Sequence, residues 1–248
     1  MLASLGRTAY GFSALLGVTL VLAPLAYLVA RRNPTSPLLE PIIGLWARSL
    51  LRAAGLSYQV EGAHHLQPGR SYVVVANHLS NLDPMLHLAG TPGPVRFLAK
   101  KELFRIPVFG PAIRAVGVVE TDRAGGPSAH SIINRQVQEV VGLGRSLVIY
   151  AEGTRSRDGL LRPFKKGAFM VAIRAQLPVV PCAIRGTHEA WRPGDWRLRG
   201  GEARMVFFEP IPTDQMTTAD GNRLRDQVHE IVAKGYGSLV ESPPSPSE

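Results

Sequence analysis

A histidine and an aspartate stand five residues apart in the segment NHLSNLD at residues 77–83. The segment directly follows an apolar run at residues 71–76, which predicts a buried strand. A carboxylate that holds one ring nitrogen of a histidine fixes the tautomer, and the other nitrogen can then take a proton near neutral pH. His78 and Asp83 are therefore candidates for a general base and its partner, with an ordinary surface turn as the alternative.

Cations follow other apolar runs in the same way. The cluster EGTRSR at residues 152–157 comes after the run at 146–151, Lys100 after the run at 95–99, and Arg123 after the run at 116–121. Glycine lets the backbone approach a ligand closely, and cations suit a phosphate. Because ligands of open α/β sheets bind at the carboxyl ends of strands, we expect these segments to meet His78. A solvated basic loop is the alternative at 152–157.

Other chemistries fit the sequence less well. No G-x-S-x-G motif is present, and Cys182 lies in the apolar run VVPCAI, so we expect no covalent enzyme intermediate. No H-E-x-x-H motif is present, and His64 and His65 are adjacent and cannot easily hold one ion together, so no metal site is expected. The single cysteine also excludes a disulfide framework.

The elements that must position these residues alternate between short β-rich runs and helical patterns. This alternation predicts a single α/β domain with a largely parallel central sheet flanked by helices. The expected strands are residues 58–61, 71–76, 95–99, 116–121, 146–151, 179–184 and 204–209, and the expected helices are 128–143, 166–176 and 219–234.

An N-terminal membrane-associated helical segment, residues 1–56, precedes this domain. The stretch between Arg7 and Arg31 carries no charge, and its residues 8–30 have the length of a membrane-spanning helix. Pro24 predicts a kink in this helix and leaves open whether it spans the bilayer or enters one leaflet. Residues 37–56 predict an amphipathic helix, with Trp46 at the membrane interface or, alternatively, packed on the core. The α/β domain is expected over residues 57–240, and a disordered tail over 241–248.

The chain carries 28 Lys and Arg against 19 Asp and Glu, a net charge of +9. A basic domain attracts anionic partners such as membrane lipids, phosphorylated substrates or nucleic acid. Nucleic acid is not expected, because no recognition motif is present and the apolar N-terminal segment would serve no purpose.

Taken in order, the motifs resemble those of the glycerolipid acyltransferase family, which includes 1-acyl-sn-glycerol-3-phosphate acyltransferases. NHLSNLD matches the N-H-x-x-x-x-D motif of that family and EGTRS at 152–156 its E-G-T-R-S block. Residues 117–123 correspond to its glycine-to-arginine block, where this chain has Glu120 and Thr121, and residues 179–181 to its apolar-Pro element. The resemblance runs from about residue 57 to 210.

The resemblance implies an acyltransferase that makes phosphatidic acid from lysophosphatidic acid, with acyl-CoA or acyl carrier protein as donor and no cofactor. His78 would be the base and Asp83 its orienting partner. The substrate-binding residues would be Arg123, Glu152, Gly153, Thr154, Arg155 and Lys100, and the acyl or donor side would be lined by Val179, Val180 and Pro181.

The acyl-chain length, the donor and the oligomeric state are left open. The acceptor could instead be another lysophospholipid, a glycolipid or an amino-acid lipid. A noncatalytic protein that binds anionic lipid and a lipid hydrolase are the alternatives outside acyl transfer. The excess of arginine after residue 30 favours a membrane protein whose catalytic domain is cytoplasmic.

Overall fold

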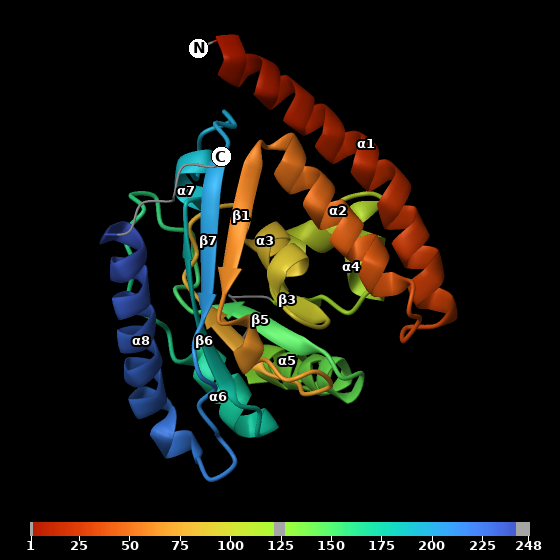
Figure 1. Cartoon of the computed structure of the whole chain (residues 1–248). Helices are drawn as coiled ribbons and strands as arrows, with labels where there is room; N and C mark the ends of the chain where they lie inside the picture. Colours follow the sequence, from red (N-terminus) through yellow and green to blue (C-terminus); the bar gives the residue numbers. More distant parts are fainter. Residues whose placement is uncertain (1, 122–126, 242–248) are drawn as a thin grey trace.

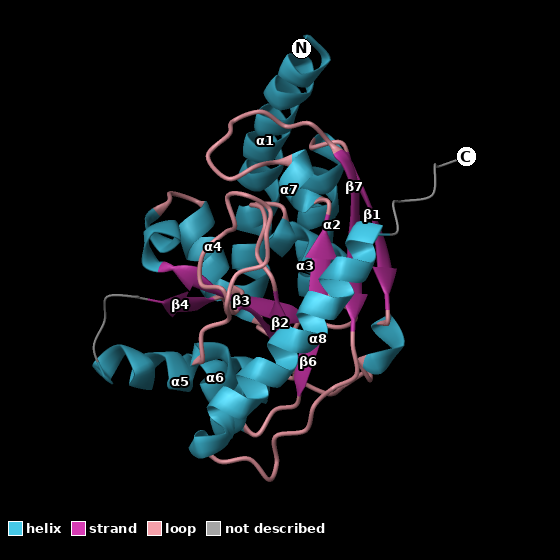
Figure 2. Ribbon diagram, turned by 90° about the vertical axis from the view of Figure 1, so that its left-hand side faces the viewer, coloured by secondary structure: helices cyan, strands magenta, loops and turns pink. Residues whose placement is uncertain are grey.

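A seven-stranded sheet forms the centre of the computed structural model, which describes residues 2–121 and 127–241. The strand order is β1-β7-β6-β2-β5-β3-β4, and every neighbouring pair is parallel except the antiparallel pair of β6 and β7 (Figures 1 and 2). The prediction of an α/β domain with a largely parallel sheet is confirmed. The strands are β1 (Leu56–Glu61), β2 (Val73–Ala76), β3 (Val95–Lys100), β4 (Val119–Thr121), β5 (Ser146–Tyr150), β6 (Val179–Arg185) and β7 (Gly201–Phe207).

Helices cover both faces of the sheet, as Figure 1 shows. On one face lie α5 (Pro127–Gly142), α6 (Gly167–Ala175) and α8 (Gly221–Glu241); on the other lie α3 (Asp83–Gly90) and α7 (Thr187–Ala190). The central strand β2 has apolar side chains on both faces. Val73 and Val75 belong to the core under α5, α6 and α8, whereas Val74 and Ala76 belong to the core under α3 and α7. A strand that is buried on both faces needs the continuous apolar run that the sequence provides.

Three short helices were not expected from the sequence, namely α3, α4 (Phe109–Ala115) and α7. Each is eight residues or shorter, so none shows enough turns for a helical period to be visible. Three 3₁₀ turns complete the described elements: η1 (Ala63–His65), η2 (Lys101–Arg105) and η3 (Thr218–Asp220).

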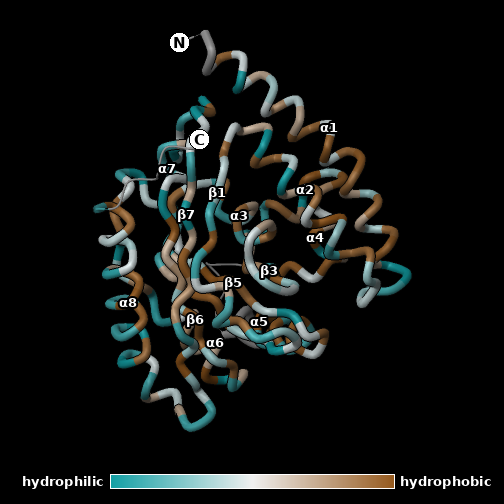
Figure 3. The backbone as a smooth tube through the Cα atoms, in the orientation of Figure 1, coloured by the Kyte–Doolittle hydropathy of each residue, from teal (hydrophilic) through white to brown (hydrophobic). Residues whose placement is uncertain are grey.

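The N-terminal segment is a helical hairpin of α1 (Leu2–Arg32) and α2 (Leu39–Ala53). Pro24 lies inside α1, which remains one helix. Within the described residues α1 is the one helix long and apolar enough to cross a membrane, and only 11% of its most apolar window is buried. Apolar residues run along its length (Figure 3), and Leu16, Val21 and Leu28 are exposed. This apolar surface indicates association with a membrane.

The second helix, α2, packs against α1 and α3, in agreement with the alternative that placed it on the protein core. The indole nitrogen of Trp46 donates to Thr19 Oγ1 at 3.0 Å, and its ring stacks on Phe109 of α4. Trp46 therefore joins α1, α2 and α4.

A partly buried ion pair ties α2 to the sheet. Arg96 of β3 is 1% exposed, and its guanidinium donates to both carboxylate oxygens of Glu40 at 2.6 and 3.1 Å. Arg145 lies beside it and donates to Val116 O and Pro34 O, the latter in the connection between α1 and α2. Burial, followed by the Arg96 charge, lowers the pKa of Arg145 to about 10. The N-terminal hairpin is thus held on the domain by charge-assisted hydrogen bonds.

Candidate active site

His78 and Asp83 form the pair that the sequence predicts. The Nδ1 atom of His78 lies 2.7 Å from Asp83 Oδ2, and the His78 side chain is 17% exposed while that of Asp83 is fully buried. A buried carboxylate at this distance keeps the proton on Nδ1, and Nε2 is then free to accept a proton. His78 lines the main cavity of the described structure, so the free nitrogen can meet a ligand there.

Local backbone contacts hold this pair. The same oxygen of Asp83 accepts hydrogen bonds from the backbone N–H groups of Leu79 and Ser80, at 2.7 and 2.8 Å. Asp83 also begins α3, where a negative charge is favoured by the helix dipole. At the end of β2, the Asn77 amide exchanges two hydrogen bonds of 2.8 Å with the backbone of Ile184 in β6. The turn is therefore fixed at both ends.

Glu152 contacts the backbone of the turn that carries His78 and does not pair with Arg155. Its Oε1 atom accepts a hydrogen bond from the backbone N–H of His78 at 2.9 Å, and the residue is 3% exposed. Burial raises the pKa of this carboxyl to about 7, against the hydrogen bonds from the His78 and Arg162 backbones, which lower it. Glu152 thus joins the end of β5 to the turn that carries His78.

Arg155 does not pair with Glu152. Its guanidinium donates to the side-chain oxygen of Asn81, and the N–H of the neighbouring Ser156 donates to His78 O at 2.8 Å. Asn81 lies within the NHLSNLD segment, so the two motifs interlock through these bonds. The sequence pattern gave no indication of this partner.

A cavity of about 2070 Å³ opens beside His78. Most of its walls are apolar and come from α1, α2, α3, η2 and α4, for instance Leu15, Leu50, Met85 and Leu103. Its cationic residues come from β3, from η2, from the segment between β5 and α6, and from α6 itself: Arg96, Lys100, Lys101, Arg155, Lys165, Lys166 and Arg174. The site combines an apolar volume, a base and positive charge, which suits an anionic amphiphile.

Of the candidate substrate-binding residues, Lys100, Gly153, Thr154 and Arg155 line this cavity. Gly153 has a φ of +74°, and a Cβ there would lie 3.1 Å from Lys165 Nζ, so the turn is suited to glycine and carries the lysine against it. Arg123 falls outside the described residues.

The apolar-Pro element is placed differently from the expectation. Val179, Val180 and Pro181 are the first three residues of β6, where they pair with β2 and are buried in the sheet. None of the three lines the cavity described above. A direct contact with an acyl chain therefore does not follow from their position, because strands on both sides and helices on both faces enclose them.

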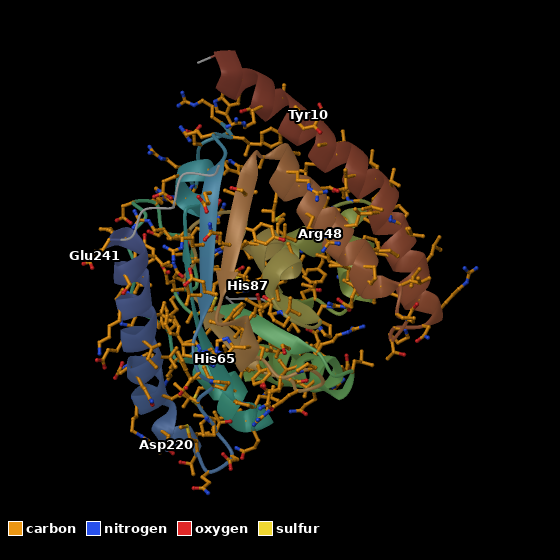
Figure 4. The ribbon with its side chains drawn as sticks, viewed as in Figure 1. Tyr10, Arg48, His65, His87, Asp220 and Glu241 are labelled. Carbon is orange, nitrogen blue, oxygen red and sulfur yellow. The ribbon has the colours of Figure 1, made fainter. Side chains whose placement is uncertain are left out.

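Two ring-bearing residues near the His78–Asp83 pair could not be identified from the sequence. Tyr150, the last residue of β5, stacks on the His78 ring, and His87 lies one turn after Asp83 on α3. Figure 4 shows His87 in the interior of the molecule, and burial lowers its pKa to about 4, so it is neutral at physiological pH. An apolar run gives no sign of which of its members will touch a motif elsewhere in the chain.

The family model described as Acyltransferase matches residues 57–185. A 1-acyl-sn-glycerol-3-phosphate acyltransferase alpha of Homo sapiens is 33% identical over 174 residues, which is 70% of this chain and 62% of the relative. The corresponding beta protein is 31% identical over 82% of this chain and 73% of its own length. The chain spans about three fifths of the length of the first curated relatives it matches.

Among solved structures, the 1-acyl-sn-glycerophosphate (LPA) acyltransferase PlsC from Thermotoga maritima is similar to this chain with a TM-score of 0.84 and 25% identity. The match covers 98% of this chain and 99% of that structure, and so includes the N-terminal helices as well as the sheet.

Proposed function

The chain belongs to the acyltransferase family, and we propose that it transfers a fatty acyl group from a thioester donor to the free sn-2 hydroxyl of lysophosphatidic acid, giving phosphatidic acid. The observation that carries the proposal is the His78–Asp83 pair at the edge of a large apolar cavity with cations on its rim.

The reaction follows from the position of the free ring nitrogen. His78 Nε2 takes the proton of the acceptor hydroxyl while that oxygen attacks the thioester carbonyl. The new C–O bond forms, the C–S bond breaks, and the proton passes from the imidazolium to the departing thiolate. Asp83 stabilises the imidazolium between these steps. No acyl-enzyme and no cofactor are needed in this scheme.

Phosphate is the natural ligand of the cations near His78. Arg155 and Lys100 line the cavity from two different strand ends, and Lys165 lies against the Gly153 turn. A guanidinium and an ammonium group that line the same cavity suit the phosphate of the acceptor. We propose Arg155, Lys100, Gly153 and Thr154 as acceptor-binding residues, with Glu152 supporting the turn, and keep Arg123 as a candidate.

The acceptor and product are membrane lipids, and the apolar walls of the cavity belong partly to α1, the helix with the exposed apolar surface. A lysolipid could therefore enter the site from the bilayer without crossing water. We propose that the catalytic domain is cytoplasmic, since the excess of arginine follows the apolar part of α1, beginning with Arg31 and Arg32 in its last turn. A polyanionic donor, acyl-CoA or acyl carrier protein, would be attracted by the net positive charge.

A direct assay tests the proposal. The full chain, in detergent or lipid vesicles, is given lysophosphatidic acid with acyl-CoA or acyl carrier protein in separate reactions, and phosphatidic acid is measured. We expect product from the wild type, loss of at least about a hundredfold in His78→Ala, and wild-type rates in His64→Ala, an exposed histidine outside the cavity.

Other lysophospholipids, a glycolipid and an amino-acid lipid serve as competing acceptors in the same assay. A higher kcat/KM for one of these would move the proposal to that acceptor. Release of free fatty acid in place of acylated lipid would identify a hydrolase, and binding of anionic lipid without turnover would identify a noncatalytic protein. Undiminished product with His78→Ala would refute the mechanism.

A further inference from the structure

The base of the proposed reaction lies flat against an aromatic side chain. The rings of His78 and Tyr150 are nearly parallel, with an interplanar angle of 11° and 4.0 Å between centroids. Tyr150 in turn is parallel to Phe97 of β3 at a centroid distance of 6.3 Å. The hydrogen bond to Asp83 fixes one edge of the imidazole, and Tyr150 covers one face, so the plane of the ring is determined by two independent contacts.

The hydroxyl of Tyr150 contributes nothing visible to this arrangement. Its oxygen is buried and has no hydrogen-bond partner among the described residues, and burial raises the pKa of the phenol, which keeps it neutral. A buried hydroxyl without a partner destabilises the folded state. The ring of Tyr150 is therefore the part of the side chain that serves the site, and a phenylalanine should serve equally well.

The positive charge that forms during the proposed reaction lies on His78, the residue against which the Tyr150 ring stacks. When His78 accepts the proton of the acceptor hydroxyl it becomes a cation, and the face of an aromatic ring attracts a cation. The attraction acts on the protonated state and not on the neutral resting state, so it favours the transition state over the bound substrates. The carboxylate of Asp83 also stabilises the imidazolium, through its hydrogen bond to Nδ1 at the edge of the His78 ring.

We propose that Tyr150 is a positioning residue of acyl transfer, whose ring holds the His78 imidazole toward the cavity and stabilises the imidazolium. The inference rests on the proposed function, since it assigns Tyr150 to the same base. Ordinary packing in the core is the competing explanation, because Tyr150 also packs against buried residues of the sheet.

Three variants separate the two explanations. Tyr150→Phe keeps the ring and removes the unpaired hydroxyl, whereas Tyr150→Leu removes the ring. Phe207→Leu is the matched control, because Phe207 is buried in the same core cluster but neither stacks on His78 nor lines the cavity. Steady-state kcat and KM for both substrates, and the thermal unfolding midpoint, are measured for each.

We expect Tyr150→Leu to lower kcat about tenfold relative to Phe207→Leu, with each KM within about twofold of the wild type. Tyr150→Phe should have a kcat within about twofold of the wild type. Equal losses in Tyr150→Leu and Phe207→Leu would reduce Tyr150 to core packing, and a tenfold loss in Tyr150→Phe would assign the role to the hydroxyl. Either result overturns the proposal.

The geometry is tested without turnover by NMR of ring-labelled histidine. Protons above the face of an aromatic ring are shielded, so the His78 ring resonance, assigned with His78→Ala, should lie upfield in the wild type and in Tyr150→Phe. A resonance without this shielding would overturn the stacking even if Tyr150→Leu fails to fold. Inactivity of the wild type with every acceptor would instead refute the proposed function, and the two failures are therefore distinguishable.

Discussion

Replacing Glu152 by glutamine should stabilise this protein at neutral and alkaline pH. The carboxylate is buried, and one of its oxygens accepts the His78 N–H at 2.9 Å. Glutamine keeps a carbonyl oxygen for the His78 N–H and has nearly the same volume. The substitution therefore removes the ionisable group while it leaves the turn around His78 in place.

The magnitude follows from the raised pKa. Burial moves the pKa of Glu152 from 4.5 to about 7. Between these values the folded state holds a proton that the unfolded chain has released, so the free energy of unfolding falls as pH rises through this window. At about 1.4 kcal/mol for each pKa unit, the cost approaches about 3.5 kcal/mol well above pH 7. Glu152→Gln avoids this cost.

Denaturant unfolding of the full chain in detergent micelles, over a pH series from about 4 to about 8, measures the effect. We expect Glu152→Gln to match the wild type near pH 4 and to be more stable by about 3 kcal/mol near pH 8. Glu139→Gln is the control, since Glu139 is exposed on α5. Parallel curves for Glu152→Gln and the wild type would show that the buried carboxyl is not perturbed, and would refute the reasoning.

Two further predictions concern other buried groups. Glu40→Ala should lower the free energy of unfolding by about 2 kcal/mol in the same assay, because it leaves Arg96 buried without its counter-ion. This value is below that for a fully buried pair because Glu40 is 37% exposed. Unchanged stability would show that the ion pair makes no net contribution to folding. Cys182 is fully buried and burial raises the pKa of its thiol, so a thiol reagent should label it only on unfolding and leave activity intact. Labelling of the folded protein with loss of activity would contradict this placement.

The sequence is most informative where the interacting residues are close in the chain. His78 and Asp83 are five residues apart, and the turn between them is closed by its own backbone N–H groups, so the pair could be predicted before any fold was known. The parallel sheet was predictable for a similar reason, because strands that are buried on both faces must be apolar along their whole length.

The remaining features needed the tertiary structure. Strands β2 and β5 are neighbours although about seventy residues separate them, and only this pairing brings Glu152 to the His78 N–H and Tyr150 to the His78 ring. The position of α2 between α1 and α3 could not be read from its apolar face, since such a face packs equally well on a membrane or on protein.

The chain by itself therefore determined the chemistry of the base and the class of the fold, since both are encoded by residue types at short spacing. The tertiary structure decided what surrounds the base: the carboxyl of Glu152 behind it, the ring of Tyr150 against its face, and the two N-terminal helices as walls of its cavity. These contacts join segments that are distant in sequence, and the apolar patterns that form them do not specify their partners.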